Sequence, residues 1–375
     1  MKAVIAIDSF KGSLSTFQAG EAAEKGIKKV YPDAKVYISP LADGGEGTTE
    51  AVISATGGRM EKVKVSNPIG DIIETSYGIS GETAVIEMSA AAGITLVEER
   101  NPLNATTFGV GEMIADAIKK GCRKFIIGIG GSVTNDGGAG MLQALGFEFL
   151  DKDGNSIEKG AKGLKNLCTI RTENAMPELS ECSFSVACDV TNPLCGENGC
   201  SNIYGPQKGA TAEMIKDMDL WLAGYAELTK KINKNADKDA QGAGAAGGMG
   251  FALMAYLGAK LESGVELVIK ETALEKHIKD ADFVITGEGR LDGQSYMGKA
   301  PIGVAKLAKK YDKPVIAFSG CVTSDAIKCN EHGIDAFFPI LREVCTLEKA
   351  MDVTYAAANL ENTAEQVFRL IKAMR

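Results

Sequence analysis

The chain has 375 residues, of which 45% are hydrophobic and 24% are charged, and its formal net charge is -8. This composition is typical of a globular protein, and the length exceeds what one hydrophobic core usually serves, so two domains are expected. The acidic balance, with no run of more than two Lys or Arg residues, argues against a nucleic-acid partner or an anionic membrane surface. A small molecule is the expected binding partner.

The cysteines and the apolar segments predict a cytoplasmic location. The nine cysteines include no Cys-x-x-Cys pair and no Cys/His cluster of the zinc type, so we expect reduced thiols that fill core space. The N-terminus reaches Asp8 after only five apolar residues, which is too short for a signal-peptide core. The uncharged stretch 242–259 contains six glycines, which predicts a buried Gly-rich loop and a core helix rather than a membrane span.

Short apolar runs, each followed by a polar Gly-rich turn and then by helical periodicity, predict βα units and mostly parallel sheets. The first strand is expected over 2–7 and the first helix over 15–30, opened by a capping box of Ser15 and Gln18. A second strand over 35–39 and a second helix, ended by the glycine pair at 57–58, complete two such units.

The middle of the chain begins with β-like alternation. We expect strands between 61 and 87, at 124–129 and at 183–188, helices at 107–120 and 212–232, and a hairpin with Asp153 and Gly154 at its turn. The C-terminal part predicts strands at 283–286 and 314–318 and a last helix over 350–374. The fold class is therefore α/β with two domains. Residues 1–62 with 283–375 form a Rossmann-like doubly wound domain, and residues 63–282 form an inserted α/β domain.

Polar side chains follow most of the predicted strands. They are Asp8 and Lys11, Asp43 and Glu46, Ser132 with Asn135 and Asp136, Asp189, and Glu288 with Arg290 and Asp292. In open α/β sheets ligands bind beyond the carboxyl ends of the strands, where loop amides and helix N-termini converge. These loops are therefore the candidate binding region.

Two Gly-rich loops are candidates for contact with phosphate. GGSVTNDGGAG at 130–140 has the glycines that let backbone amides approach an anion, although tight turns and close helix packing remain an alternative. It matches neither the Walker motif nor the dinucleotide fingerprint. GAGAAGGMG at 242–250 has the G-x-G-x-x-G spacing, but no strand precedes it, which disfavours a dehydrogenase. Packing and anion binding both stay open for this loop.

The charged residues fit phosphoryl transfer, which needs cations for the phosphates and carboxylates for Mg²⁺ and for the attacking hydroxyl. Lys11, Arg290 and Lys299 are the candidate cations, and Asp189, Glu288 and Asp292 are the candidate carboxylates. The two histidines, His277 and His332, are expected to be solvated or structural. The sequence contains no Gly-x-Ser-x-Gly motif, which argues against a hydrolase of the usual serine type.

Seven motifs, in order along nearly the whole chain, resemble the bacterial type-1 glycerate kinase family. They are DSFKGSLS at 8–15, PLADGGEGT at 40–48, GGSVTNDGGAGMLQALG at 130–146, CDVTNPLCG at 188–196, YGPQKGA at 204–210, GAGAAGGMG at 242–250 and TGEGRLDGQSYMGKAPIGVA at 286–305. The resemblance implies ATP-dependent phosphorylation of D-glycerate with Mg²⁺, usually at the 2-hydroxyl, in a cleft between two α/β domains. Residues 195–200 depart from the family pattern, which affects only the local loop.

The resulting hypothesis assigns a role to each candidate residue, and the roles within each group are interchangeable. ATP is expected to contact Gly130, Gly131, Ser132, Asn135, Asp136, Gly244 and Gly247. Mg²⁺ is expected near Asp189, Glu288 and Asp292. The expected catalytic residues are Asp189, Lys11, Arg290 and Glu288. Of these, Lys11 or Arg290 is expected to bind the glycerate carboxylate. Alternatives are phosphorylation at the 3-hydroxyl and a non-catalytic regulator that binds a nucleotide or sugar acid. A homo-oligomer is left open.

Overall fold

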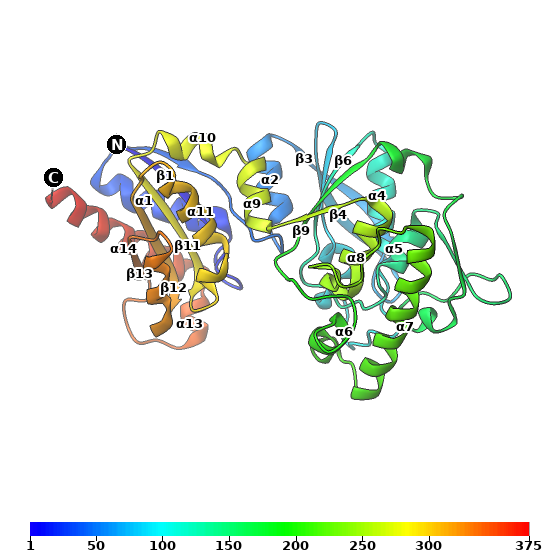
Figure 1. The fold of residues 1–375 in the computed structure, drawn as a ribbon. Coiled ribbons are helices and arrows are strands. Elements are labelled where there is room, and N and C mark those ends of the chain that lie inside the picture. The colour runs from blue at the N-terminus through cyan, green and yellow to red at the C-terminus, as the bar shows by residue number, and fades with distance from the viewer. Residues whose placement is uncertain (375) are drawn as a thin grey trace. The chain divides into compact units, whose positions relative to one another are not determined.

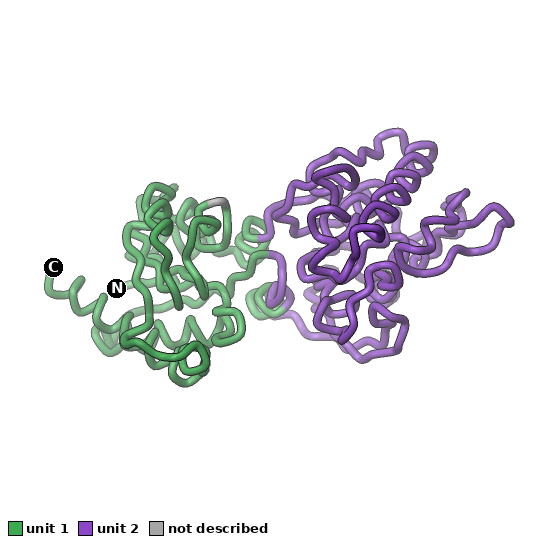
Figure 2. Tube along the Cα trace, turned by 90° about the horizontal axis from the view of Figure 1, so that it is seen from below, with its two compact units in different colours: residues 1–43, 50–56, 265–375 green, residues 44–49, 57–264 purple. Residues whose placement is uncertain are grey.

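The computed structural model describes residues 1–374 and contains two compact units, each with its own sheet (Figure 1, Figure 2). Unit 1 comprises residues 1–43 and 50–56 and the chain from 265 onward, and unit 2 comprises residues 44–49 and 57–264. The domain boundaries predicted after residues 62 and 282 stay a prediction.

The sheet of unit 1 is wholly parallel. Its order is β13 (Ala336–Pro339), β12 (Val315–Val322), β11 (Phe283–Leu291), β1 (Lys2–Ile7) and β2 (Lys35–Ile38). Numbered by their sequence within the unit, the strands run 2-1-3-4-5, which is a doubly wound arrangement. The predicted α/β class with mostly parallel strands is confirmed.

Helices cover both faces of this sheet (Figure 1). The helices α1 (Thr16–Val30) and α14 (Val353–Ala373) pack on each other, and their apolar residues share a core with Ala3, Ile5 and Ile7 of β1. Because side chains alternate along a strand, Val4 and Ala6 face the opposite side, where α11 (Ala300–Lys309) contacts β1 and β11. The predicted capping box of Ser15 and Gln18 is present at the start of α1.

The sheet of unit 2 is mixed, with the order β10 (Lys260–Glu262), β9 (Ser183–Ala187), β6 (Lys124–Gly128), β5 (Thr83–Glu87), β4 (Ile72–Ser80) and β3 (Arg59–Ser66). The strands β3, β4 and β5 form the antiparallel part that the alternation after residue 61 predicts. The remaining neighbours are parallel. The principal helices are α4 (Phe108–Lys119), α5 (Ala139–Ala144), α7 (Ala212–Ile232) and α8 (Ala245–Leu257).

Two local predictions need correction. The strand expected to end at residue 286 continues as β11 to Leu291, because β12 runs beside it as far as Val322. The chain does turn at Asp153 and Gly154, but the return segment forms only an isolated bridge between Leu150 and Ser156. The ladder partner of β7 (Glu148–Leu150) is instead β8 (Thr169–Arg171), whose Ile170 is buried opposite Phe149.

Among residues 1–374, no helix has both the length and the apolar character needed to cross a membrane. In the uncharged stretch 242–259, positive φ angles at Ala246, Gly247 and Gly248 interrupt the first part of α8, and a regular buried helix follows, as expected for a Gly-rich loop and a core helix. All nine cysteines are free thiols. The cytoplasmic location stays a prediction.

Candidate active site

The candidate site of unit 1 lies where the strand order of its sheet reverses. The chain passes from β1 to β2 in one direction, whereas β11 pairs with the other edge of β1. The loops after β1 and β11 therefore diverge at this point and leave a hollow between them, as is usual for the switch point of a doubly wound sheet. A hollow of 510 Å³ is found there, and its lining includes residues 8–11, 288–290 and 292.

Two carboxyl groups lie largely buried in this hollow. Asp8 is 4% exposed, and its Oδ1 accepts a hydrogen bond of 2.7 Å from the backbone N–H of Ser9. Burial, with the charge of Asp43 as the second cause, raises the pKa of Asp8 to about 7. Glu288 accepts a hydrogen bond from the Ser295 hydroxyl, and burial raises its pKa as well. The hollow thus holds a carboxyl group that exchanges its proton near neutral pH.

Three cationic side chains line the same hollow and face carboxylates. The Nζ atom of Lys11 lies 3.2 Å from Oδ2 of Asp43. Asp292 lies 3.4 Å from Nε of Arg290 and 4.0 Å from Nζ of Lys299. The side chains of Lys11 and Arg290 are 68% and 65% exposed, so both can turn toward an anionic ligand.

An apolar wall completes the hollow. It consists of Phe10, Ile340, Leu347 and Met351, together with Leu341. Apolar surface beside a few convergent charged groups is typical of a site for a small organic molecule. The arrangement suits a compact organic anion that brings a hydroxyl to the buried carboxyl groups.

The Gly-rich loops come together in unit 2, at the carboxyl ends of β6 and β9. The N–H of Gly137 donates to the carbonyl of Gly247 at 2.9 Å, and the N–H of Gly244 donates to the carbonyl of Asn192 at 2.9 Å. A Cβ on Gly244 would lie 2.2 Å from the carbonyl oxygen of Pro193. Glycine at position 244 is therefore required for the close approach of the loop 242–250 to residues 192–193.

Asp136 anchors the first of these loops from inside. Its fully buried carboxylate accepts hydrogen bonds from the N–H groups of Thr107 (2.8 Å), Gly138 (3.1 Å) and Gly140 (3.3 Å), and from the Thr107 hydroxyl. Asn135 is also buried, and its Nδ2 donates to the Ser201 hydroxyl at 2.8 Å. These contacts fix the conformation of residues 130–140.

Lys208 is a residue that sequence reasoning did not select. Its side chain is buried, and Nζ donates to the carbonyl of Thr134 at 2.6 Å and to the Ser132 hydroxyl at 3.1 Å. Burial lowers the pKa of Lys208 to about 8. Its place inside the YGPQKGA motif could have indicated a functional role. A lysine next to polar residues is, however, normally predicted to be exposed. Asp8 was noticed after the first strand but not selected, because nothing in the sequence indicates its burial.

The predicted residues fall into two groups. Lys11, Glu288, Arg290, Asp292 and Lys299 line the hollow of unit 1, whereas Asp189 and the Gly-rich loops belong to unit 2. Asp189 follows β9 and is exposed, and its Oδ1 accepts a hydrogen bond of 3.1 Å from the N–H of Gly264. Within residues 1–374, no three His, Cys, Asp or Glu side chains gather as a preformed metal site.

The model of the glycerate kinase family matches residues 3–372. The chain belongs to the glycerate kinase family. A glycerate 2-kinase from Escherichia coli K12 is 52% identical over 359 residues, which cover 95% of this chain and 94% of the relative. A glycerate kinase from Bacillus subtilis is 46% identical, with 99% of this chain and 98% of the relative covered.

A solved structure of a similar protein has the same fold. The crystal structure described as a glycerate kinase 2 from Salmonella typhimurium LT2 is 48% identical, with a TM-score of 0.91 and coverage of 100% of this chain and 98% of that one. The resemblance predicted from the seven motifs is confirmed. As a member of the glycerate kinase family the protein is an enzyme, and its kinase class implies ATP as a substrate.

The raised pKa of Asp8 predicts a pH dependence of stability. Between the ordinary Asp value of 3.8 and the folded value of about 7, the native state binds more protons than the unfolded state, so the free energy of unfolding falls as pH rises. Asp8→Asn removes this titration. In urea unfolding without added ligand, the stability of the wild type relative to Asp8→Asn should fall from pH 4 to pH 7, and parallel profiles would contradict the assignment.

The contacts of Asp136 predict a large effect on the stability of unit 2. Asp136→Ala leaves three backbone N–H groups without an acceptor and should lower the free energy of unfolding by roughly 3 kcal/mol, measured by chemical denaturation. Asp237→Ala is the matched control, because among the described residues this exposed carboxylate accepts a hydrogen bond only from Asp239 N–H. Its cost should stay below about 1 kcal/mol. Equal effects of the two variants would show that Asp136 is not an anchor.

Proposed function

We propose that the protein transfers the γ-phosphoryl group of ATP to the 2-hydroxyl of D-glycerate, which gives 2-phosphoglycerate and ADP. The observation that carries this proposal is the match to the glycerate kinase family over residues 3–372, together with the E. coli glycerate 2-kinase at 52% identity. The name of that relative is the reason for preferring the 2-hydroxyl over the 3-hydroxyl.

The hollow of unit 1 is the proposed glycerate site. A three-carbon acid needs one cationic contact for its carboxylate, and the exposed head groups of Lys11 and Arg290 supply two candidates. Its hydroxyls then lie on the side of the buried carboxyl groups Asp8 and Glu288, which are 4% and 8% exposed. The volume of 510 Å³ leaves space beside glycerate for the phosphoryl group that it accepts.

The reaction is an in-line displacement at the γ-phosphorus. A bond forms from the glycerate hydroxyl oxygen to phosphorus while the bond to the oxygen of the ADP leaving group breaks, and the hydroxyl proton passes to a carboxylate. From the sequence this role was open to Asp189, Glu288 and Asp292. The pKa of Asp8, raised to about 7, makes it a second candidate, because a base works best when its pKa lies near the working pH.

Mg²⁺ fits the donors that are present, because this ion takes one or two carboxylates together with substrate phosphates and water. Glu288 and Asp292, which line the hollow of unit 1, would hold it. The role of Asp189, which belongs to unit 2, stays a prediction from the sequence. When bound, the ion neutralises charge on the phosphates. Because such a site is completed by the nucleotide, the proposal does not require three side chains gathered in advance.

The Gly-rich loops of unit 2 are the proposed nucleotide contact. Support comes from the close packing of residues 130–138 on 242–250, in which the N–H groups of Gly137, Gly138 and Gly140 donate within the protein and so fix the backbone that carries the other amides of the first loop. Fixed amides stabilise phosphate charge without reorganising. Gly130, Gly131, Ser132, Gly244 and Gly247 are the proposed contacts, and the buried Asn135 and Asp136 hold the first loop in shape.

Phosphorus NMR tests the reaction and its regiochemistry together. With ATP, Mg²⁺ and D-glycerate, the enzyme should form ADP and a phosphomonoester whose signal coincides with that of 2-phosphoglycerate. A signal of 3-phosphoglycerate would replace the proposed acceptor hydroxyl. No glycerate-dependent ADP would instead favour the non-catalytic regulator.

Substitutions in each unit test the residue assignments. Lys11→Ala in unit 1 and Asp189→Ala in unit 2 should each lower kcat by at least about a hundredfold, the scale of losing one positioned electrostatic group. Lys25→Ala is the control, because Lys25 is an exposed lysine of α1 outside the hollow. Turnover at the wild-type rate in either variant would remove that residue from the mechanism.

A further inference from the structure

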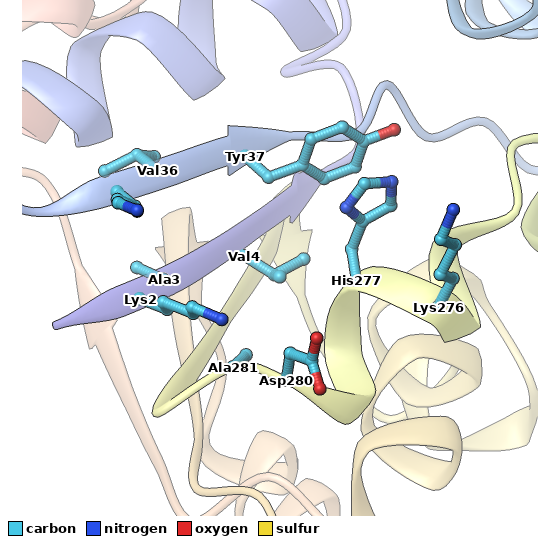
Figure 3. A pocket seen from close by; sticks show the side chains of 10 residues that line it. Lys2, Ala3, Val4, Val36, Tyr37, Lys276, His277, Asp280 and Ala281 are labelled. Carbon is cyan, nitrogen blue, oxygen red and sulfur yellow. The ribbon is translucent and has the colours of Figure 1, made fainter.

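A second hollow of unit 1 lies at the amino ends of the sheet strands, whereas Asp8 lies at their carboxyl ends. It has a volume of 240 Å³ and is formed by the amino-terminal parts of β1 and β2 together with α10 (Leu274–Lys279) and the turn that follows it. Figure 3 shows Tyr37 of β2 facing His277 of α10, with Lys276 and Asp280 at the same hollow. None of these residues takes part in the proposed phosphoryl transfer.

Positive charge is concentrated at this hollow. Lys2, Lys35 and Lys276 line it, and Asp280 is the only acidic residue among its described lining. Within residues 1–374, none of the three ammonium groups forms a salt bridge, and the hydrogen bond of 2.7 Å from Lys2 to Oδ2 of Asp282 comes from its backbone N–H. In a chain with a net charge of -8, three lysines against the single carboxylate of Asp280 leave the lining of this hollow with an excess of positive charge. An anion placed among them would relieve their mutual repulsion.

The walls of the hollow are preformed. The rings of Tyr37 and His277 stack with their centroids 3.4 Å apart and their planes 10° from parallel. Ala3 and Val4 are buried below them. Burial, then the charge of Lys276, lowers the pKa of His277, so its ring is neutral at pH 7 and can donate one hydrogen bond. A ligand here meets packed aromatic and apolar surface on one side and exposed lysine side chains around it.

The volume of the hollow limits the size of the ligand that it can hold. A volume of 240 Å³ is below the range of about 300–1,000 Å³ typical of drug-sized ligands, so a nucleotide is too large. We propose that this hollow is a second ligand site, which binds a small phosphate-bearing anion through Lys2, Lys35 and Lys276. Inorganic phosphate and the phosphomonoester of a short hydroxy acid share the required chemistry. The second of these belongs to the class of the product proposed above, but binding here does not depend on that proposal.

Histidine NMR offers a direct test, because the chain has only two histidines. The full-length protein is titrated with inorganic phosphate, and separately with 2-phosphoglycerate, at fixed pH and constant ionic strength. His277→Gln assigns the ring signals. The His277 signal should shift with saturation, whereas that of His332, which stacks on Tyr296, should stay unchanged. Tighter binding of one titrant identifies the ligand source.

Charge-matched variants provide the control. Lys2→Gln/Lys276→Gln should weaken the binding reported by His277 by at least about tenfold, because one charge-assisted contact is worth about a factor of ten in a binding constant. Lys25→Gln/Lys306→Gln removes two exposed lysines of α1 and α11 elsewhere in unit 1 and should leave binding unchanged. No saturable shift at His277, or equal binding by both double variants, would overturn the proposal. Neither readout uses kinase activity, so failure here is distinct from failure of the proposed function.

Discussion

The parallel pairing of β1 with β11 is the constraint on which the candidate site of unit 1 depends. It aligns Ile7 with Gly287, and the N–H of Asp8 continues the ladder by donating to the carbonyl of Gly287 at 2.9 Å. Residues that are far apart in the sequence thereby meet at the carboxyl ends of neighbouring strands. Since β2 lies on the other side of β1, the following loops must diverge there, and the space between them becomes a hollow lined by charged groups.

Buried charge is handled differently in the two units. In unit 2 the carboxylate of Asp136 is surrounded by backbone donors, and the ammonium group of Lys208 donates to a carbonyl and a hydroxyl. Such satisfied groups hold loops in shape. In unit 1 Asp8 receives a hydrogen bond from Ser9 and faces the charge of Asp43. Burial raises the pKa of both carboxyl groups, but the donors around Asp136 oppose this rise, whereas the charge of Asp43 adds to it at Asp8, whose pKa is about 7. A carboxyl group of the second kind suits proton transfer better than anchoring.

Although the chain as a whole is acidic, one hollow of unit 1 is lined mainly by lysines. A net charge of -8 argues against extended polyanions as partners but does not decide the potential at any one hollow. β1 connects two such places, because its amino end lines the cationic hollow of Lys2 and its carboxyl end leads to Asp8. The two ends of one strand thus offer sites of different charge and size.

The sequence by itself determined the α/β class, most helix and strand positions, the capping box of Ser15 and the family, because local periodicity, turn chemistry and long motifs are properties of neighbouring residues. It also selected Lys11, Glu288, Arg290 and Asp292, since polar residues after strands indicate the carboxyl edge of a sheet. Only the tertiary structure decided that Ile170 pairs with Phe149, that Lys208 is buried and that Asp8 carries a raised pKa. Each of these depends on the desolvation or pairing of residues far apart in the chain, which leaves no periodic pattern in the sequence.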